Sequence, residues 1–404
     1  MKLNMRKISY KNLILLPVTI SFFSLSTVYA LTVNPNKIQS IKEPELVFSP
    51  TKTEKNIKNI EMVFVLDTTG SMGGLIEGAK TKIWRIVNTV MQSTEKVNFK
   101  MGLVAYRDKG DSYITEVTPL SDDLDRVYGK LMAYRVDGGG DEPEDVRSAM
   151  RDALNKVGWS DAAPCNHLHV IPPTCSKTTQ ILFLVGDAPP HDDYQQINSA
   201  QETAQTAWAR GIRVNTIQVG NISATTKIWQ EIAKSGGGEY FAIAQNGGVK
   251  AIATPYDKEL SDLGDKVNSD ALYYGQKNDQ LKLQEEGKQF GSSLAGASTV
   301  ARADRAANKS INYRAYNSRD LIQAIENQEI NLSTIKKDEL PEIMQNNTLS
   351  ENKKYIDERI LKRKVLREKI AELSKKRDLF LKENEKNTDG FDAVVFKALE
   401  KQIK

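Results

Sequence analysis

The 404-residue sequence has few of the side chains that build thiol and imidazole chemistry, with only two cysteines and three histidines. It also lacks a nucleophile elbow, a phosphate-binding loop and an HExxH pair, which mark several large classes of enzyme. No second carboxylate cluster is present for a two-metal site. We therefore expect a binding protein without catalytic residues. A metal-dependent hydrolase is the alternative, with His191 or Asp108 as its base.

An excess of charge of one sign is also absent. The 56 basic and 52 acidic residues give a formal net charge of +4. Residues 1–30 contain four basic residues and no acid, so without them the net charge is 4 − 4 = 0. A neutral chain offers no general electrostatic attraction to nucleic acid, and we expect no nucleic-acid partner.

Long apolar runs are missing except near the start. Basic residues precede the apolar stretch 13–25, and small residues follow at Val28 and Ala30, which is the pattern of a signal peptide. The stretch is shorter than the ~20 apolar residues that a membrane span needs. We expect residues 1–30 to be removed, leaving an exported protein with no membrane span. Its location would be the periplasm, the cell surface or the medium.

The two cysteines, Cys165 and Cys175, lie close together in the sequence. In an exported chain this spacing predicts one disulfide that closes a small loop. His167 and His169 lie inside the loop, so a Cys/His zinc site is the alternative. Zinc sites usually contain more closely spaced cysteine pairs.

After a polar, proline-containing linker at 31–59, short apolar runs alternate with segments of helical periodicity over residues 60–252. This alternation predicts an α/β domain with a doubly wound, mostly parallel sheet. Segment 113–120 is rich in β-branched residues and fits an edge strand. The expected strands are 62–66, 97–106, 180–186, 214–219 and 240–243, and the expected helices are 74–91, 122–134, 143–157, 200–210 and 227–234.

The remaining chain has a mainly helical pattern. We divide it into a mixed companion region, 253–340, and a charged helical region, 341–404. The first is expected to contain a strand at 271–275 and a helix at 291–307, and the second helices at 351–384 and 391–403. Leu366, Ile370, Leu373 and Phe380 have coiled-coil spacing, although Arg377 interrupts it. The long helix would either form homo-oligomers, giving a structural assembly protein, or pack on its own domain.

Oxygen-bearing side chains follow the buried strands of the predicted sheet. Asp67 ends the first strand, Thr69 and Ser71 follow at alternate positions, and Asp187 ends the strand 180–186. Asp141 lies in a loop that begins with three glycines. The carboxyl ends of parallel strands meet at one edge of the sheet. Because hard cations prefer oxygen ligands, these five residues predict a Mg²⁺ site, with Mn²⁺ or Ca²⁺ as alternatives.

The segment 67–71, DTTGS, resembles the Asp-x-Ser-x-Ser signature of von Willebrand factor A (VWA) domains, where it begins the metal-ion-dependent adhesion site. Together with AYRD at 105–108, GGGDEPED at 138–145 and DAPPH at 187–191, it is similar to a branch found in bacterial exported proteins and in eukaryotic proteins that carry this domain beside an atypical kinase. The sequence contains no kinase motif set. The resemblance covers about residues 58–252. It implies a VWA fold whose ion keeps one coordination position open for an exposed acidic residue of a partner protein.

One position departs from the family pattern. The family's aspartate maps onto Asp187, but its threonine maps best onto Asp141. A third carboxylate would weaken the attraction for an acidic ligand or favour Ca²⁺ or Mn²⁺. We hypothesise that Asp141 reaches the ion only through a water, while direct contact is the alternative. Glu144 could contact the ion either directly or through a water, and Asp108 could border the site.

Overall fold

The computed structural model describes residues 58–92, 97–140, 142–160, 178–194, 197–248, 251–384 and 390–403. The predicted signal peptide, nearly all of the linker, Asp141 and both cysteines lie outside these ranges. The predicted disulfide therefore stays a prediction. No helix in the described ranges combines the length and apolar composition that a membrane crossing requires.

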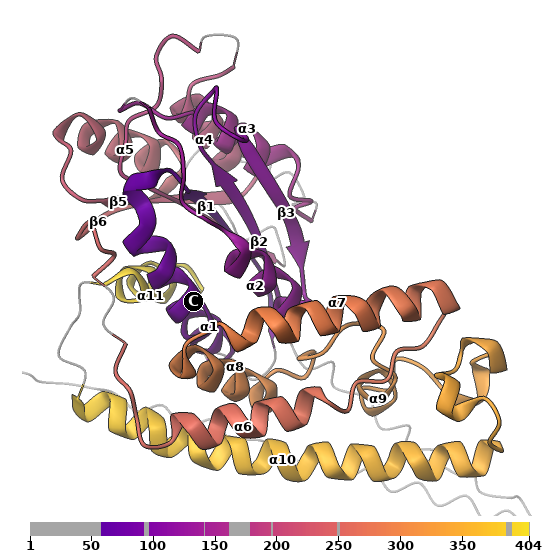
Figure 1. The fold of residues 1–404 in the computed structure, drawn as a ribbon. Helices are drawn as coiled ribbons and strands as arrows, with labels where there is room; N and C mark the ends of the chain where they lie inside the picture. The colour runs from indigo at the N-terminus through magenta and orange to yellow at the C-terminus, as the bar shows by residue number, and fades with distance from the viewer. Residues whose placement is uncertain are drawn as a thin grey trace, which may run out of the picture. The chain divides into compact units, whose positions relative to one another are not determined.

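A six-stranded sheet with the order β3-β2-β1-β4-β5-β6 forms the centre of residues 58–243 (Figure 1). All neighbouring strands pair in parallel except β2 and β3, which are antiparallel and place β3 at the edge. This confirms the predicted doubly wound, mostly parallel sheet. The strands are β1 (Lys58–Asp67), β2 (Val97–Tyr106), β3 (Thr115–Ser121), β4 (Thr178–Gly186), β5 (Ile212–Val219) and β6 (Gly237–Ile243).

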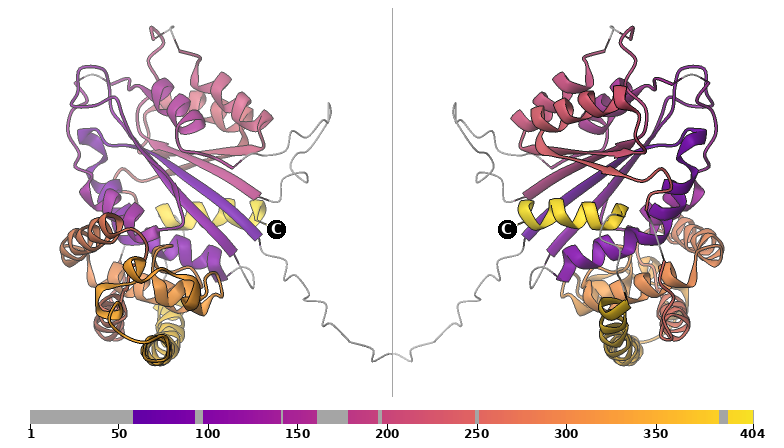
Figure 2. Two further views of the ribbon diagram at one scale, coloured as in Figure 1. Left: turned by 90° about the vertical axis from the view of Figure 1, so that its right-hand side faces the viewer. Right: turned by 90° about the vertical axis from the view of Figure 1, so that its left-hand side faces the viewer.

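Helices cover both faces of the sheet (Figure 2). Alternating side chains of β1 enter separate cores, with Phe64 on one face and Val63 and Val65 on the other, as the two-residue period of a strand requires. One face packs against α1 (Gly73–Gln92), α2 (Leu124–Ala133) and α11 (Phe391–Gln402). The other packs against α3 (Val146–Asn155), α4 (Ala200–Ala209) and α5 (Ser223–Ser235).

The predicted elements of residues 60–252 are present with shifted ends. The helix expected at 227–234 begins earlier, at Ser223. The sequence did not indicate this start because the first turn of the helix is polar and shows no apolar periodicity. The helix expected at 143–157 begins only at Val146, so the prediction of Pro143 in its first turn is wrong. Asp145 is the N-cap instead and accepts a hydrogen bond from the Ser148 backbone at 2.8 Å.

Helix α11 completes one core of the sheet although five α-helices of the described chain separate it from β6. Phe391 is wholly buried, with its ring 5.9 Å from the ring of Phe64 on β1. At the other end of α11, the Ile403 carbonyl accepts a hydrogen bond from Lys58 Nζ at 3.1 Å. The two long helices of the segment 341–404 therefore pack on different parts of the chain: the last helix packs on the sheet, and the helix at 349–384 packs on the helical region.

The helical region contains α6 (Asp257–Asn268), α7 (Lys277–Ala295), α8 (Thr299–Ile311), α9 (Leu321–Glu326) and α10 (Leu349–Asn384). Two predictions here are wrong. Residues 271–275 form no strand, and Tyr273 makes only an isolated bridge with Asp320. The single helix expected at 291–307 is the end of α7 and the start of α8, because Ser298 caps α8 by accepting a hydrogen bond from Ala301 N at 3.2 Å.

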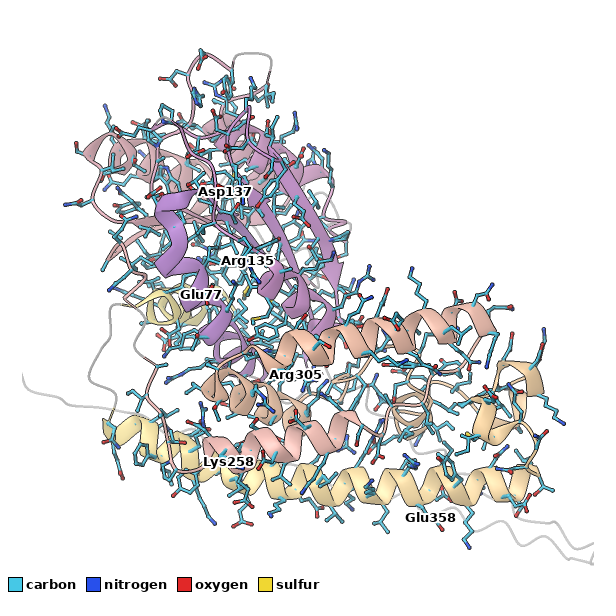
Figure 3. The ribbon with its side chains drawn as sticks, in the orientation of Figure 1. Glu77, Arg135, Asp137, Lys258, Arg305 and Glu358 are labelled. Carbon is cyan, nitrogen blue, oxygen red and sulfur yellow. The ribbon has the colours of Figure 1, made fainter. Side chains whose placement is uncertain are left out.

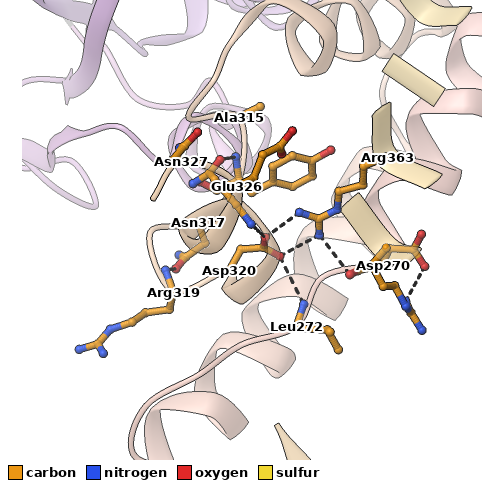
Figure 4. A network of polar contacts seen from close by, with 12 residues as sticks. Asp270, Leu272, Ala315, Asn317, Arg319, Asp320, Glu326, Asn327 and Arg363 are labelled. Carbon is orange, nitrogen blue, oxygen red and sulfur yellow. Dashed lines mark hydrogen bonds and ion pairs between the residues drawn. The ribbon is translucent and has the colours of Figure 1, made fainter. Parts of the chain in front are cut away.

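Helix α10 packs against α6, α8 and α9 of its own chain, which is the second of the two alternatives that the sequence left open. Two buried arginines hold it there. Arg363 donates to both carboxylate oxygens of Asp320 at 2.6 and 2.9 Å (Figure 4). Arg377, which interrupts the apolar pattern, donates to Asp257 at 2.6 Å and to Asp304 at 2.5 Å. Buried ion pairs of this kind can fix the register of a helix at some cost in desolvation.

Polar contacts join the helical region to the helices beneath the sheet. Arg305 of α8, labelled in Figure 3, donates to the two oxygens of Asp125 on α2 at 2.7 and 2.6 Å. Lys309 Nζ donates to the same carboxylate at 2.8 Å. Asn88 of α1 donates to the Asp304 carbonyl at 2.7 Å. Helix α1 thus connects the Asp67 loop, which precedes it, with the helical region.

Candidate metal centre

The first loop of the site follows β1. Asp67 is wholly buried, and its Oδ1 accepts two hydrogen bonds from Thr69, one from the backbone N–H at 2.9 Å and one from the hydroxyl at 2.7 Å. The Thr69 hydroxyl lies 3.4 Å from that of Ser71, which is exposed in the 3-10 turn Gly70–Met72 that precedes α1. The other carboxylate oxygen, Asp67 Oδ2, is buried and has no hydrogen-bond partner among the described residues. The loop therefore leaves one buried anionic oxygen unused.

The second loop follows β4, and Gln245 joins it to the first. The Gln245 side chain donates from Nε2 to Asp187 Oδ2 at 2.8 Å and to the Ser71 carbonyl at 3.3 Å. Gln245 belongs to the loop after β6, and sequence reasoning missed it. No motif singles out this glutamine, and only the strand order brings it to the same edge as Asp187.

Tyr106, at the end of β2, places its hydroxyl next to Gly186 and the Asp67 carboxylate. A Cβ atom added to Gly186 would lie 2.4 Å from the Tyr106 hydroxyl and 3.1 Å from Asp67 Oδ2, so only glycine leaves room for both side chains. The Tyr106 hydroxyl is buried without a hydrogen-bond partner in the described chain. Burial and the charges of nearby carboxylates raise the pKa of Tyr106, so the hydroxyl keeps its proton. The apolar strand pattern alone indicated a core side chain here.

Glu144 approaches the site from the segment before α3. Its backbone N–H donates to the Pro189 carbonyl at 3.0 Å, and its carbonyl accepts from the His191 N–H at 3.3 Å. These bonds attach Glu144 to the loop that carries Asp187. A Cβ atom on Gly139 would lie 3.0 Å from Thr69 Cβ and 3.1 Å from Glu144 Oε1. The glutamate is buried beside the first loop, and its Oε2 has no partner among the described residues.

The buried carboxylates disfavour one another's charge. Burial raises the pKa of Asp67 to about 7, with the charge of Asp187 adding to the effect and the Thr69 hydrogen bonds and Arg107 opposing it. Burial raises the pKa of Glu144 to about 9, and Asp67 is the first of several acids that add to it. Bound cations reverse this balance. The unused oxygen of Asp67 and the surrounding hydroxyls therefore fit a divalent cation.

Asp108 and Asp111 hold the loops around this centre. Asp108 accepts hydrogen bonds from the Tyr194 hydroxyl at 3.0 and 3.1 Å, and its Oδ2 lies 3.3 Å from His191 Nε2. Asp111 Oδ2 accepts from the Gly139 N–H at 3.2 Å. Asp108 is thus engaged by aromatic residues of a neighbouring loop, while Asp111 supports the glycine loop.

The structure brings Asp67, Thr69, Ser71, Asp187 and Glu144 to one edge of the sheet. In the described residues, no three side chains drawn from aspartate, glutamate, histidine and cysteine are arranged to hold a metal by themselves. A centre here would therefore depend on the hydroxyl oxygens as well as on Asp67 and Asp187. The predicted contribution of Asp141 falls on a residue outside the described ranges.

Away from this centre, a hollow of about 840 Å³ is lined by residues that include members of α2, α7 and α8. Charged side chains on its wall pair with one another. Arg305 and Lys309 bind Asp125, and Arg302 lies 2.5 Å from Asp265. These pairs join α8 to α2 and to α6, and we assign no ligand to the hollow.

Residues 61–255 match the family model of the von Willebrand factor A domain. The chain is 35% identical over 136 residues to von Willebrand factor A domain-containing protein 7 of Mus musculus, covering 31% of this chain and 15% of that protein. It is 26% identical over 132 residues to a putative ariadne-like RING finger protein of Acanthamoeba polyphaga mimivirus, covering 33% of this chain and 11% of that protein. The chain thus spans only a small part of the length of these relatives.

Among solved structures, the SpRpn10 VWA domain aligns with a TM-score of 0.30 and 14% identity, covering 46% of this chain and 88% of that domain. The family model spans β1 to β6 and the loops that carry Asp67, Glu144, Asp187 and Gln245. The match over residues 61–255 therefore supports the von Willebrand factor A domain that the DTTGS segment and its companion loops predict.

Proposed function

We propose that the VWA domain binds a protein partner through a divalent ion at the edge of the sheet. Asp67, Thr69, Ser71 and Asp187 would hold the ion, with Asp141 as a further ligand or as the partner of a bridging water. The ion would be Mg²⁺, with Mn²⁺ or Ca²⁺ as alternatives. The observation that carries this proposal is Asp67 Oδ2, a buried carboxylate oxygen without a hydrogen-bond partner among the described residues, in the loop that also carries the Thr69 and Ser71 hydroxyls.

The ion would serve as an adhesion site of the metal-ion-dependent type. A bound ion can provide a directional bond to an exposed acidic residue of the partner, which a flat protein surface lacks. Ser71 is exposed, so the ion would be reachable from solvent on this side. Once a bound ion favours its ionised form, the neighbouring Glu144 would reduce the positive charge of such a site, so the partner's acidic residue would depend on direct coordination more than on long-range attraction.

The proposal is tested by capturing partners from the exported fraction of the native cells with the purified full chain, once with Mg²⁺ and once with EDTA. Partners that bind only with Mg²⁺, and that Asp67→Ala no longer captures, would support it. Asp262→Ala, on exposed α6, serves as the matched control because it removes a carboxylate far from the site. Capture by Asp67→Ala at the wild-type level would rule out the site.

Binding without catalysis is part of this proposal. The two candidate bases of the alternative hydrolase, His191 and Asp108, lie against each other, and the His191 ring stacks on Tyr194 at 4.1 Å. The Tyr194 hydroxyl donates a hydrogen bond to Asp108, so this carboxylate is already engaged as an acceptor. Assays with phosphate-ester, acyl-ester and peptide substrates in the presence of Mg²⁺ or Zn²⁺ should give no turnover. Turnover that Asp108→Asn abolishes would favour the hydrolase.

A second candidate is self-association through α10. Leu361, Val365 and Leu379 on this helix are exposed by 62%, 57% and 61%, although other α10 residues pack on the chain itself. Exposed apolar side chains at helical spacing fit a second helix. Light scattering on the full chain and on the double substitution Leu361→Lys/Val365→Lys would separate the cases. A monomeric wild type would reject self-association.

We also propose that the protein is exported, to the periplasm, the cell surface or the medium. The basic, apolar and small-residue segments of positions 1–30 support this. N-terminal sequencing of the protein from fractionated cells should find a mature chain that begins at Leu31. An intact Met1 in the cytosolic fraction would contradict export.

A further inference from the structure

The two aspartates of the site each have one carboxylate oxygen engaged by the chain. Asp67 Oδ1 accepts both donors of Thr69, at 2.9 and 2.7 Å. Asp187 Oδ2 accepts the Gln245 amide at 2.8 Å. Asp67 Oδ2 has no hydrogen-bond partner among the described residues. At Asp187, Gln245 engages Oδ2 and not Oδ1. Each carboxylate therefore has one oxygen engaged by a neighbouring side chain and one that this neighbour leaves for coordination.

The orientation of the Gln245 amide follows from its neighbours. Its nitrogen faces two acceptors, the Asp187 carboxylate and the Ser71 carbonyl, so this end must be the donor. Its oxygen lies against Gly220, where an added Cβ atom would be only 2.0 Å away. Gly220 has a φ of 76°, a conformation that favours glycine. The turn after β5 thus leaves room for Gln245 to reach Asp187.

The number of oxygens that a carboxylate offers affects which ion it binds. Mg²⁺ demands near-octahedral geometry with short bonds, keeps several waters and takes one oxygen from each carboxylate. Ca²⁺ takes six to eight oxygens in a flexible arrangement and often uses both oxygens of one carboxylate. Two aspartates that each offer one oxygen fit the smaller ion. Freeing the second oxygen of Asp187 would improve the site for the larger one.

We infer that Gln245 is a specificity residue of the ion site: by engaging Asp187 Oδ2, it restricts Asp187 to one-oxygen coordination and favours Mg²⁺ over Ca²⁺. This inference rests on the proposed ion-binding function. Gln245 acts through Asp187 and does not itself bind the ion. Thr69 does the same for Asp67, but it also belongs to the proposed ligand set, so Gln245 is the cleaner position to test.

The test is calorimetric titration of the full chain with MgCl₂ and, separately, with CaCl₂, for the wild type, Gln245→Ala and Gln245→Glu. Loss of a residue that orients a metal ligand typically costs about 10- to 100-fold in metal affinity. We expect Mg²⁺ affinity to fall about tenfold in Gln245→Ala while Ca²⁺ affinity stays level or rises. Gln245→Glu keeps the size but removes the donor, so its preference should shift in the same direction.

Gln230→Ala is the matched control, because Gln230 is an exposed glutamine on α5 and should leave both affinities unchanged. Melting curves in EDTA establish that each variant is folded. An unchanged Mg²⁺-to-Ca²⁺ preference in both variants, or an equal loss for both ions, would overturn the inference. A wild type that binds neither ion would instead overturn the proposed function, so the two failures are distinguishable.

Discussion

Thr69 donates both its backbone N–H and its hydroxyl to the same oxygen of Asp67, at 2.9 and 2.7 Å. The carboxylate is therefore fixed in orientation, and its second oxygen is buried without a partner in the described chain. A cation-binding group that is oriented in advance loses little conformational entropy on binding. The residues that orient Asp67 should consequently affect ion affinity as strongly as many direct ligands do.

Replacing Thr69 tests this orientation. In Thr69→Ala the hydroxyl bond is lost while the backbone bond remains, and we expect Mg²⁺ affinity to fall about 10- to 100-fold. Thr69→Ser keeps a hydroxyl and should remain within a few-fold of the wild type. Calorimetric titration with MgCl₂ measures both variants. Equal affinities for Thr69→Ala and the wild type would show that the hydroxyl does not support the site.

Asp67 should lower the stability of the ion-free protein. Its pKa of about 7, raised by burial, is above the value of about 3.9 in an unfolded chain. The folded state then binds more protons, so stability falls as pH rises from about 4 to about 7 and stays low above that. In EDTA at pH 8, Asp67→Asn should melt at a higher temperature than the wild type.

Adding Mg²⁺ should reverse this order. The wild type gains stability because the ion binds only the folded state, whereas Asp67→Asn should gain little. Differential scanning calorimetry with and without Mg²⁺ gives both comparisons. A variant that melts below the wild type in EDTA would argue that the buried carboxylate is already compensated.

Asp125, at the junction of α2 and α8, should make stability depend on pH in the direction opposite to Asp67. Burial disfavours its charge, but Arg305 and Lys309 outweigh this and lower its pKa to about 2. Because this is below the unfolded value of about 3.9, the stabilisation is present above pH 4 and is lost as pH falls from about 4 to about 2. Urea unfolding should show a difference between wild type and Asp125→Asn that is constant above pH 5 and shrinks in this window. A difference independent of pH down to 2 would contradict the assignment.

Arg363 and Asp320 form a buried ion pair with both side chains 0% exposed. Breaking such a pair leaves an uncompensated charge and typically costs about 3–5 kcal/mol. We expect Arg363→Met to lower the free energy of unfolding by about this amount, and the double substitution Arg363→Met/Asp320→Leu to recover part of it. Arg319→Ala, an exposed neighbour, is the control. Chemical denaturation measures all of these, and a loss below about 1 kcal/mol would contradict the assignment.

Phe391 should be essential to the core beneath the sheet, because it is fully buried on α11 against Phe64. Phenylalanine-to-alanine changes in a core cost about 3–5 kcal/mol. Phe391→Ala should therefore destabilise the VWA domain, whereas Lys397→Ala on the exposed side of α11 should not. The midpoint of denaturant unfolding, followed by tryptophan fluorescence, reports on this domain because all four tryptophans of the chain lie within residues 84–229. Equal midpoints for the two variants would mean that the domain does not require α11.

Local sequence patterns were sufficient for most of the sheet. A buried strand produces an apolar run wherever it lies, so β1, β2 and β4 could be predicted before their order was known. The aspartates at the ends of β1 and β4 belong to the same pattern. Predictions became wrong where one residue changes the local structure, as Ser298 does by starting a new helix and Asp145 by capping α3.

The sequence by itself determined the class of fold, the alternation of strands and helices, and the loop edge where Asp67, Thr69, Ser71 and Asp187 meet. Only the tertiary structure decided that Gln245 engages Asp187, that Arg363 and Arg377 fix α10, and that α11 returns beneath the sheet. Periodicity records the environment of one segment at a time. The choice of partner between distant segments depends on shape and charge in three dimensions, and a single amide or guanidinium leaves no repeating pattern from which that choice could be predicted.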